Sequence, residues 1–112
     1  MSEFLYLYRG GMRMDSAAAI QEQTQRWVTW IKGLAEKGHV KNPGHPLESS
    51  GKVVSGKDKL VTDGPFAEKD MVGGYTLLEA TDISQAVELA KGCPIFLVGG
   101  HVEVRPILQM NM

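Results

Sequence analysis

Residues 75–94, YTLLEATDISQAVELAKGCP, contain a complete strand-to-helix unit, and this unit decides the fold. Residues 75–80 predict a strand, because they are mostly apolar and precede a helix-start signal. Asp82 can cap the helix, and Gln85 three positions later completes a pattern like a capping box. Gly92 and Pro94 predict its end. The buried stripe of the helix is predicted from four residues at helical spacing: Ile83, Ala86, Val87 and Ala90.

The first third of the chain repeats this strand-to-helix order. Residues 3–9 predict a strand that is apolar on both faces, so we expect both faces to be covered. One face carries Phe4, Tyr6 and Tyr8, and the other carries Leu5 and Leu7. Asp15 or Ser16 can cap a long helix that ends at about Lys37, before Gly38. Its apolar stripe, which we expect to pack in the core, comprises Ile20, Thr24, Trp27, Trp30, Ile31 and Leu34.

The rest of the chain supplies a hairpin and a last strand. Residues 39–50 are rich in Pro and Gly and predict a loop. Residues 52–54 and 59–61 bracket a turn and predict a β-hairpin, and residues 101–105 predict the last strand. The order predicts an α+β fold, a ferredoxin-like βαββαβ sandwich with an extra hairpin, whose antiparallel sheet carries both helices on one face. At 112 residues we expect a single domain, 1–112.

The composition argues against several classes of partner. Twelve basic and thirteen acidic residues give a net charge of −1 without a basic patch, so we expect no nucleic-acid partner. No apolar run approaches the ~18 residues of a membrane span, and the N-terminus does not read as a signal peptide. Cys93 is the single cysteine, which is typical of a reducing compartment and predicts a cytoplasmic protein with a structural thiol.

We expect no metal and no other cofactor. His39 and His45 lie six residues apart without a matching cluster of carboxylates or cysteines, which argues against a metal site formed by them. The three Gly-Gly pairs do not follow the spacing of a dinucleotide-binding or phosphate-binding loop.

The stretch VTDGPFAEKDMVGGY, residues 61–75, places Asp63 before Gly64-Pro65. An aspartate in a turn usually accepts a hydrogen bond from the amide two residues later, but Pro65 has no N–H. Three interpretations remain open: a role in a site or across a chain interface, a cap of one helical turn through the amide of Phe66 or Ala67, or plain solvation. We expect the carboxylate to point into a partly enclosed pocket at the rim of the fold.

The last strand offers polar candidates. Val102 and Val104 share the face that suits the core, and His101, Glu103 and Arg105 share the other. In a monomer this polar face would be solvated, and Glu103 and Arg105 could pair with each other. Between two sheets it would line an enclosed space, where charges are costly unless they are paired or used.

Tyr6 and Tyr8 leave two interpretations open. Tyrosine combines an apolar ring with a hydroxyl group, so these side chains could contact a small ring compound. They could equally pack at an interface.

The ordered motifs LVTDG, TDGPFAE, GGY and GHVEVRPI resemble the YCII-related family, specifically its DGPF subgroup, over nearly the whole chain. The resemblance implies a fold that dimerises sheet to sheet into a dimeric α+β barrel, with a site inside the barrel or at its mouth. One relative is a dehydrochlorinase acting on a ring-cleavage product, and similar folds host muconolactone isomerases and monooxygenases. In the family, the aspartate matching Asp63 is the natural candidate for an active-site acid or base.

Two functional hypotheses follow. The first is a homodimeric, cofactor-independent enzyme or enzyme-like binder, isomerase-like or lyase-like, acting on a small organic acid or a ring-derived metabolite. The alternative is a non-catalytic dimeric module that senses a ligand or assists transcription. In the first hypothesis Asp63 and His101 are catalytic, and the substrate-binding residues are Arg105, Tyr6, Tyr8 and Glu103, with Arg105 holding an anionic group.

Overall fold

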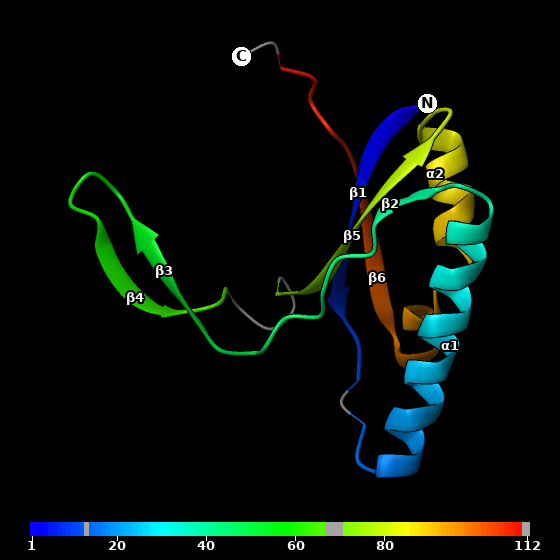
Figure 1. Ribbon diagram of the computed structural model, residues 1–112. Helices are drawn as coiled ribbons and strands as arrows, with labels where there is room; N and C mark the ends of the chain where they lie inside the picture. The colour runs from blue at the N-terminus through cyan, green and yellow to red at the C-terminus, as the bar shows by residue number, and fades with distance from the viewer. Residues whose placement is uncertain (13, 67–70, 111–112) are drawn as a thin grey trace.

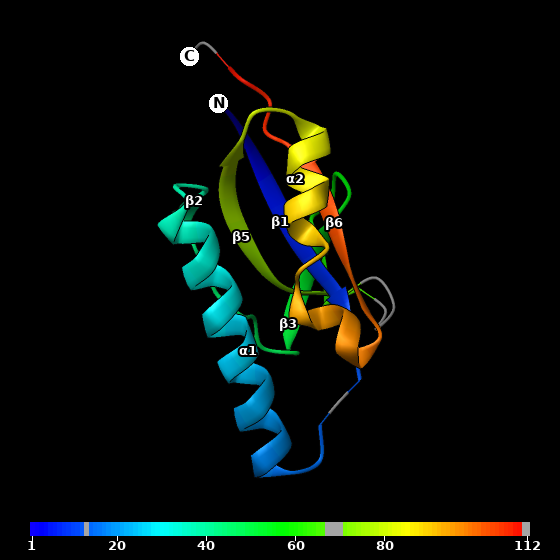
Figure 2. The same cartoon turned by 90° about the vertical axis from the view of Figure 1, so that its right-hand side faces the viewer.

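The computed structural model describes residues 1–12, 14–66 and 71–110 and has the α+β fold that the sequence predicts. Its main sheet is antiparallel, with the strand order β2-β5-β1-β6. Both helices lie on one face of this sheet (Figures 1 and 2). The elements of this layer pair are β1 (Ser2–Gly10), α1 (Ala17–Glu36), β2 (Val40–Asn42), β5 (Val72–Ala80), α2 (Ile83–Ala90) and β6 (Gly100–Pro106).

The second strand of the ferredoxin-like order lies where the sequence predicts a loop. Residues 39–50 contain β2, which pairs with β5 at the edge of the sheet. A strand of three residues is too short to show an alternating pattern, which is why the pattern missed it. The predicted hairpin is confirmed as β3 (Gly51–Ser55) and β4 (Leu60–Gly64), and it forms a separate two-stranded sheet.

The helices begin at the predicted capping residues. Ser16 Oγ accepts a hydrogen bond from the Ala19 amide at 3.0 Å, and α1 ends just before Gly38, whose φ is +80°. Asp82 Oδ1 accepts from the Gln85 amide at 2.9 Å at the start of α2. A short helical turn that the sequence did not predict, η2 (Pro94–Val98), connects α2 to β6.

The core lies between the sheet and the helices and contains the aromatic face of β1. Phe4, Tyr6 and Tyr8 are buried there, and the Tyr6 hydroxyl donates to the Ala86 carbonyl. The Tyr6 ring stacks on Trp30 with centroids 6.1 Å apart. The interpretation of these tyrosines as interface packing is therefore wrong, because helices of the same chain cover them.

Both predicted helix stripes are only partly buried. Ala86 and Ala90 are buried, whereas Ile83 and Val87 are 46% and 39% exposed, because the small alanines bring α2 onto the sheet and leave the larger side chains at its margin. Ile20 is also exposed. The first turns of α1 extend past the end of the sheet (Figure 2).

The opposite side of the sheet, called the open face below, has no helix over it in the described part of the chain. The strand register places four half-buried side chains at its centre: Leu5, Leu7, Tyr75 and Leu77. Charged side chains surround them. Ion pairs join Arg9 to Glu103 at 2.7 Å and Lys41 to Glu3 at 2.6 Å. Of the helices described, none has the length and apolarity needed to cross a membrane.

Candidate ligand-binding pocket

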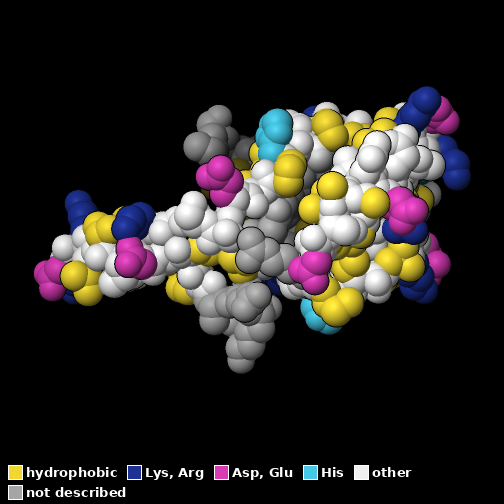
Figure 3. Space-filling model, turned by 90° about the horizontal axis from the view of Figure 1, so that it is seen from below, with side chains coloured by type: hydrophobic (Ala, Val, Ile, Leu, Met, Phe, Trp, Pro, Cys, Tyr) yellow, Lys and Arg dark blue, Asp and Glu magenta, His cyan; other side chains and the backbone are white. Residues whose placement is uncertain are grey.

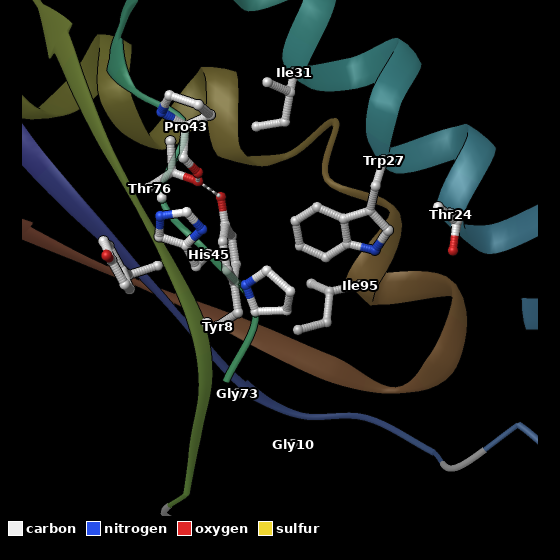
Figure 4. A pocket seen from close by; sticks show the side chains of 14 residues that line it. Tyr8, Gly10, Thr24, Trp27, Ile31, Pro43, His45, Gly73, Thr76 and Ile95 are labelled. Carbon is white, nitrogen blue, oxygen red and sulfur yellow. Dashed lines mark hydrogen bonds between the residues drawn. The ribbon is translucent and has the colours of Figure 1, made fainter. Parts of the chain in front are cut away.

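A cavity of about 410 Å³ opens between α1 and the sheet. Strands β1 and β5 form its floor, α1 forms one wall, and the loop at residues 43–46 forms the opposite wall (Figure 4). η2 closes one side with Ile95. Gln23 of α1 fixes this side, because its Nε2 donates to the Pro94 carbonyl at 2.7 Å next to Ile95.

Aromatic and aliphatic side chains line most of the cavity. The Trp27 indole reaches from α1 toward the Tyr8 ring, with Ile31 and Ile95 on either side (Figure 4). Tyr8 and Trp27 meet edge to face, with centroids 4.7 Å apart and planes at 85°, a favourable arrangement for two aromatic rings. The sequence predicted a core role for Trp27, and the half-buried indole also provides a wall of this pocket.

A chain of hydrogen bonds fixes the polar groups of the floor. The Tyr8 hydroxyl donates to Thr76 Oγ1 at 2.7 Å, and Thr76 Oγ1 donates to the Pro43 carbonyl at 2.9 Å. Burial raises the pKa of Tyr8 far above its usual value, although the hydrogen bond to Thr76 opposes this effect. Tyr8 is therefore a protonated donor at neutral pH and cannot act as a base.

Two glycines allow the loop at residues 43–46 to lie against β5. Gly44 has a φ of +73°, and a Cβ atom there would lie 1.8 Å from the Tyr75 carbonyl oxygen. A Cβ atom on Gly74 would lie 3.1 Å from the His45 carbonyl oxygen. Backbone hydrogen bonds then hold the loop, from the Tyr75 amide to His45 O at 3.3 Å and from the Leu47 amide to Gly73 O at 2.8 Å.

His45 is the one imidazole among the residues that line the cavity in the described part of the chain, and no Lys, Arg, Asp or Glu joins it there. Its ring packs edge to face on Tyr75 at 6.3 Å. The lining thus suits an uncharged ring with a substituent that can hydrogen-bond to His45. Sequence reasoning considered His45 only as a metal ligand. The available signal was its Pro-Gly-His-Pro context within the loop that the sequence predicts at residues 39–50.

The predicted catalytic Asp63 lies outside this pocket. It is on β4 of the projecting hairpin, its side chain is 91% exposed, and it pairs with Lys52 on the neighbouring strand. Within one chain, its carboxylate faces solvent on β4 and does not enter the partly enclosed pocket that the sequence led us to expect. Ala67 and Glu68, at the end of the TDGPFAE motif, lie outside the described residues.

The other predicted site residues are divided between the two faces of the sheet. His101, Glu103 and Arg105 share the open face, as the alternation on β6 predicted. Glu103 binds Arg9, and it binds Arg105 at 3.4 Å. The hydrogen bond from Arg9, followed by the charges of both arginines, lowers the pKa of Glu103. Tyr8 lines the pocket under the helices, whereas Tyr6 lies deeper in the core.

Within one chain, the structure does not bring the candidate catalytic residues together. Asp63 belongs to the hairpin sheet and His101 to the main sheet (Figure 1). Their joint role stays a prediction that needs a second chain.

Burial raises the pKa of the Cys93 thiol to about 11 and keeps it protonated, which supports a structural role. Among the described residues, no three His, Cys, Asp or Glu side chains are grouped so that they could hold a metal ion.

The comparison with known protein families gives one clear result. The YCII-related domain matches residues 12–111, which is most of the chain. No curated protein matches it. The observed α+β fold, with an antiparallel sheet and helices on one face, is the fold that this resemblance implied. The chain belongs to the YCII-related family.

Proposed function

We propose that this chain is a small-molecule-binding homodimer of the DGPF subgroup and that its pocket under α1 takes an uncharged, ring-derived metabolite. The observation that supports this most is the cavity of about 410 Å³ with aromatic walls. Pockets that bind small molecules are typically ~300–1,000 Å³, mostly apolar, and carry a few placed polar groups. This cavity lies at the small end of that range, which favours a ligand of one or two rings.

The polar groups of the pocket indicate which ligands fit. The Tyr8 hydroxyl already donates its hydrogen bond to Thr76. Tyr8 therefore shapes the pocket more than it recognises a polar group of the ligand. His45 can accept or donate one hydrogen bond at the rim. A carboxylate would find no cationic side chain of Lys or Arg on the described walls. Of the two ligand classes that the sequence suggested, the ring-derived metabolite therefore fits this pocket better than the small organic acid.

An acid/base reaction, isomerase-like or lyase-like, remains part of the proposal. Imidazole is a common general acid or base in enzymes, and His45 supplies one at this pocket. Asp63 and His101 would join the chemistry only if a second copy brought the hairpin of one chain to the open face of the other. The alternative is a non-catalytic sensor that uses the same pocket. Turnover of a bound compound would favour the enzyme, and binding without turnover would favour the sensor.

The test fills the pocket and measures binding. Ile31→Phe adds volume inside the cavity, and Val28→Phe makes the same kind of change on the exposed side of α1 as a matched control. Ligands come from a panel of phenols, unsaturated lactones and muconate-like acids, with affinity measured by titration calorimetry. We expect Ile31→Phe to weaken ring ligands at least tenfold and Val28→Phe to leave them unchanged. Equal affinity in both variants would remove the pocket from the proposal.

A second variant tests the polar end of the pocket. His45→Ala removes one hydrogen bond, which contributes ~0.5–1.5 kcal/mol, so we expect an affinity loss of roughly 3–10-fold for ligands with a polar substituent. Ligands without that substituent should bind His45→Ala and the unchanged protein equally. A uniform loss for both kinds of ligand would argue that His45 only shapes the loop.

A further inference from the structure

The hairpin β3–β4 extends away from the rest of the chain, on the side of the open face (Figure 1). Its strands pair with each other in a sheet of their own. The radius of gyration is 15.7 Å, whereas a compact chain of this length has about 13 Å. The accessible surface is 8,159 Å², roughly 2,000 Å² more than the ~6,100 Å² of a compact monomer of this mass. One chain alone therefore exposes an unusually large surface.

Both faces of the hairpin carry exposed apolar side chains. Val54 and Val61 are a cross-strand pair on one face and are 63% and 59% exposed. Leu60 belongs to the other face and is 64% exposed. On the projecting arm, hydrophobic side chains lie beside charged ones (Figure 3). An isolated two-stranded hairpin is marginally stable in water, so this one needs a surface to pack on.

The open face is the second uncovered surface, and it is too small to hold a dimer by itself. Four strands at ~4.8 Å spacing and eight residues at ~3.4 Å give a face of about 500 Å². A stable interface buries about 800 Å² on each partner. The hairpin supplies the missing area, because it projects on the same side of the sheet (Figure 1).

We propose that the hairpin is a dimerisation arm that packs on the open face of a second copy of this chain. The inference rests on the proposed homodimer and identifies the element that holds it together. A two-fold axis lets each arm contact the other copy, because a symmetric interface uses the same patches on both chains. The Val54–Val61 pair then covers the apolar centre of the second open face around Leu7 and Tyr75.

Arm exchange would also complete a site. Asp63 follows Thr62 on β4 and shares the hairpin face of Val61, so an arm that docks by this face carries Asp63 to the second chain. The open face of the second copy presents the polar side chains of β6, which include His101 and Arg105. The two halves of the candidate catalytic set lie apart within one chain, and the exchange places them on facing surfaces.

The first test is the oligomeric state of charge variants, measured by sedimentation equilibrium. The unchanged protein should have twice the 12.3 kDa chain mass. We expect Val61→Asp to weaken dimerisation at least tenfold, and Lys57→Asp, a turn substitution on the same arm, to leave it unchanged. A monomeric unchanged protein would overturn both the homodimer and the arm. A dimer that is equally strong in Val61→Asp would overturn the arm and leave the homodimer standing.

The second test does not depend on the folding of a charged variant. Val61→Cys in an isotopically heavy chain and Leu7→Cys in a light chain, both with Cys93→Ala, are mixed and treated with a short bismaleimide. Mass spectrometry should find the heavy arm peptide linked to the light sheet peptide. As a control, Lys57→Cys at the turn should give less of this product than Val61→Cys. Absence of this heavy–light link for Val61→Cys, or an equal yield of it for Lys57→Cys, would overturn the proposal.

Discussion

Gly44→Ala should separate the pocket wall from β5, because the backbone of the loop lies too close to the strand for a side chain. A Cβ atom at this position would lie 1.8 Å from the Tyr75 carbonyl oxygen. The contacted atom is backbone, so it cannot rotate away as a flexible side chain would. The loop must therefore move, and the cavity loses its wall at His45.

The expected cost can be worked out from the contacts that are lost. A left-handed φ of +73° disfavours Ala by ~1–2 kcal/mol. Displacing the loop also breaks the hydrogen bonds from the Tyr75 and Leu47 amides, at about 0.5–1.5 kcal/mol each. We expect Gly44→Ala to lower the free energy of unfolding by about 2–5 kcal/mol and to abolish ligand binding in the pocket.

Gly38→Ala is the matched control for this prediction. Gly38 has a similar φ of +80°, but nothing lies within 4 Å of its potential Cβ atom. Its substitution should therefore cost only the conformational term, ~1–2 kcal/mol. Both variants are measured by urea unfolding followed by tryptophan fluorescence. If Gly44→Ala and Gly38→Ala lose equal stability and both bind ligand, the close approach of the loop does not shape the pocket.

Three further predictions concern stability. Gly33→Ala, in the interior of α1 with open space around it, should raise the free energy of unfolding by about 0.5–1 kcal/mol and raise Tm; a lower Tm would contradict the helix assignment. Tyr8→Phe should cost about 0.5–1.5 kcal/mol in urea unfolding while ring ligands still bind, because only the donor to Thr76 is lost; abolished binding would give the hydroxyl a direct role. Burial raises the pKa of Cys93 from 9.0 to about 11, so its contribution to stability is complete below pH 9 and is lost as the pH rises to 11. Unfolding midpoints across this range should fall less in Cys93→Ala, and parallel curves would contradict the burial effect.

The sequence predicted the parts of the fold that depend on local patterns. The alternation on β6 correctly placed Val104 and Glu103 on opposite faces, and Asp82 correctly marked the start of α2. β2 was missed because three residues carry too little periodicity. The faces of β1 were both apolar, so the pattern could not tell which one the helices cover.

The pocket could not be predicted for a different reason. Tyr8, Trp27, His45 and Thr76 come from four separate segments. The pairing of β1 with β5 brings Tyr8 to Thr76, the packing of α1 adds Trp27, and the close approach of the loop to β5 adds His45. Local patterns carry no information on such long-range packing. The Gly64-Pro65 context predicted a site role for Asp63. Within one chain, however, Asp63 lies on the projecting hairpin, away from the pocket.

The central claim, that the cavity under α1 is the ligand site, is tested most directly by methyl NMR of the isoleucine side chains. The chain has five isoleucines, and Ile31 and Ile95 line the cavity, whereas Ile20, Ile83 and Ile107 do not. When a ring ligand from the panel is titrated into protein with labelled δ1 methyl groups, the signals of Ile31 and Ile95 should shift together with one affinity, and the other three should stay in place. Ligand-dependent shifts confined to Ile20, Ile83 or Ile107 would contradict the claim.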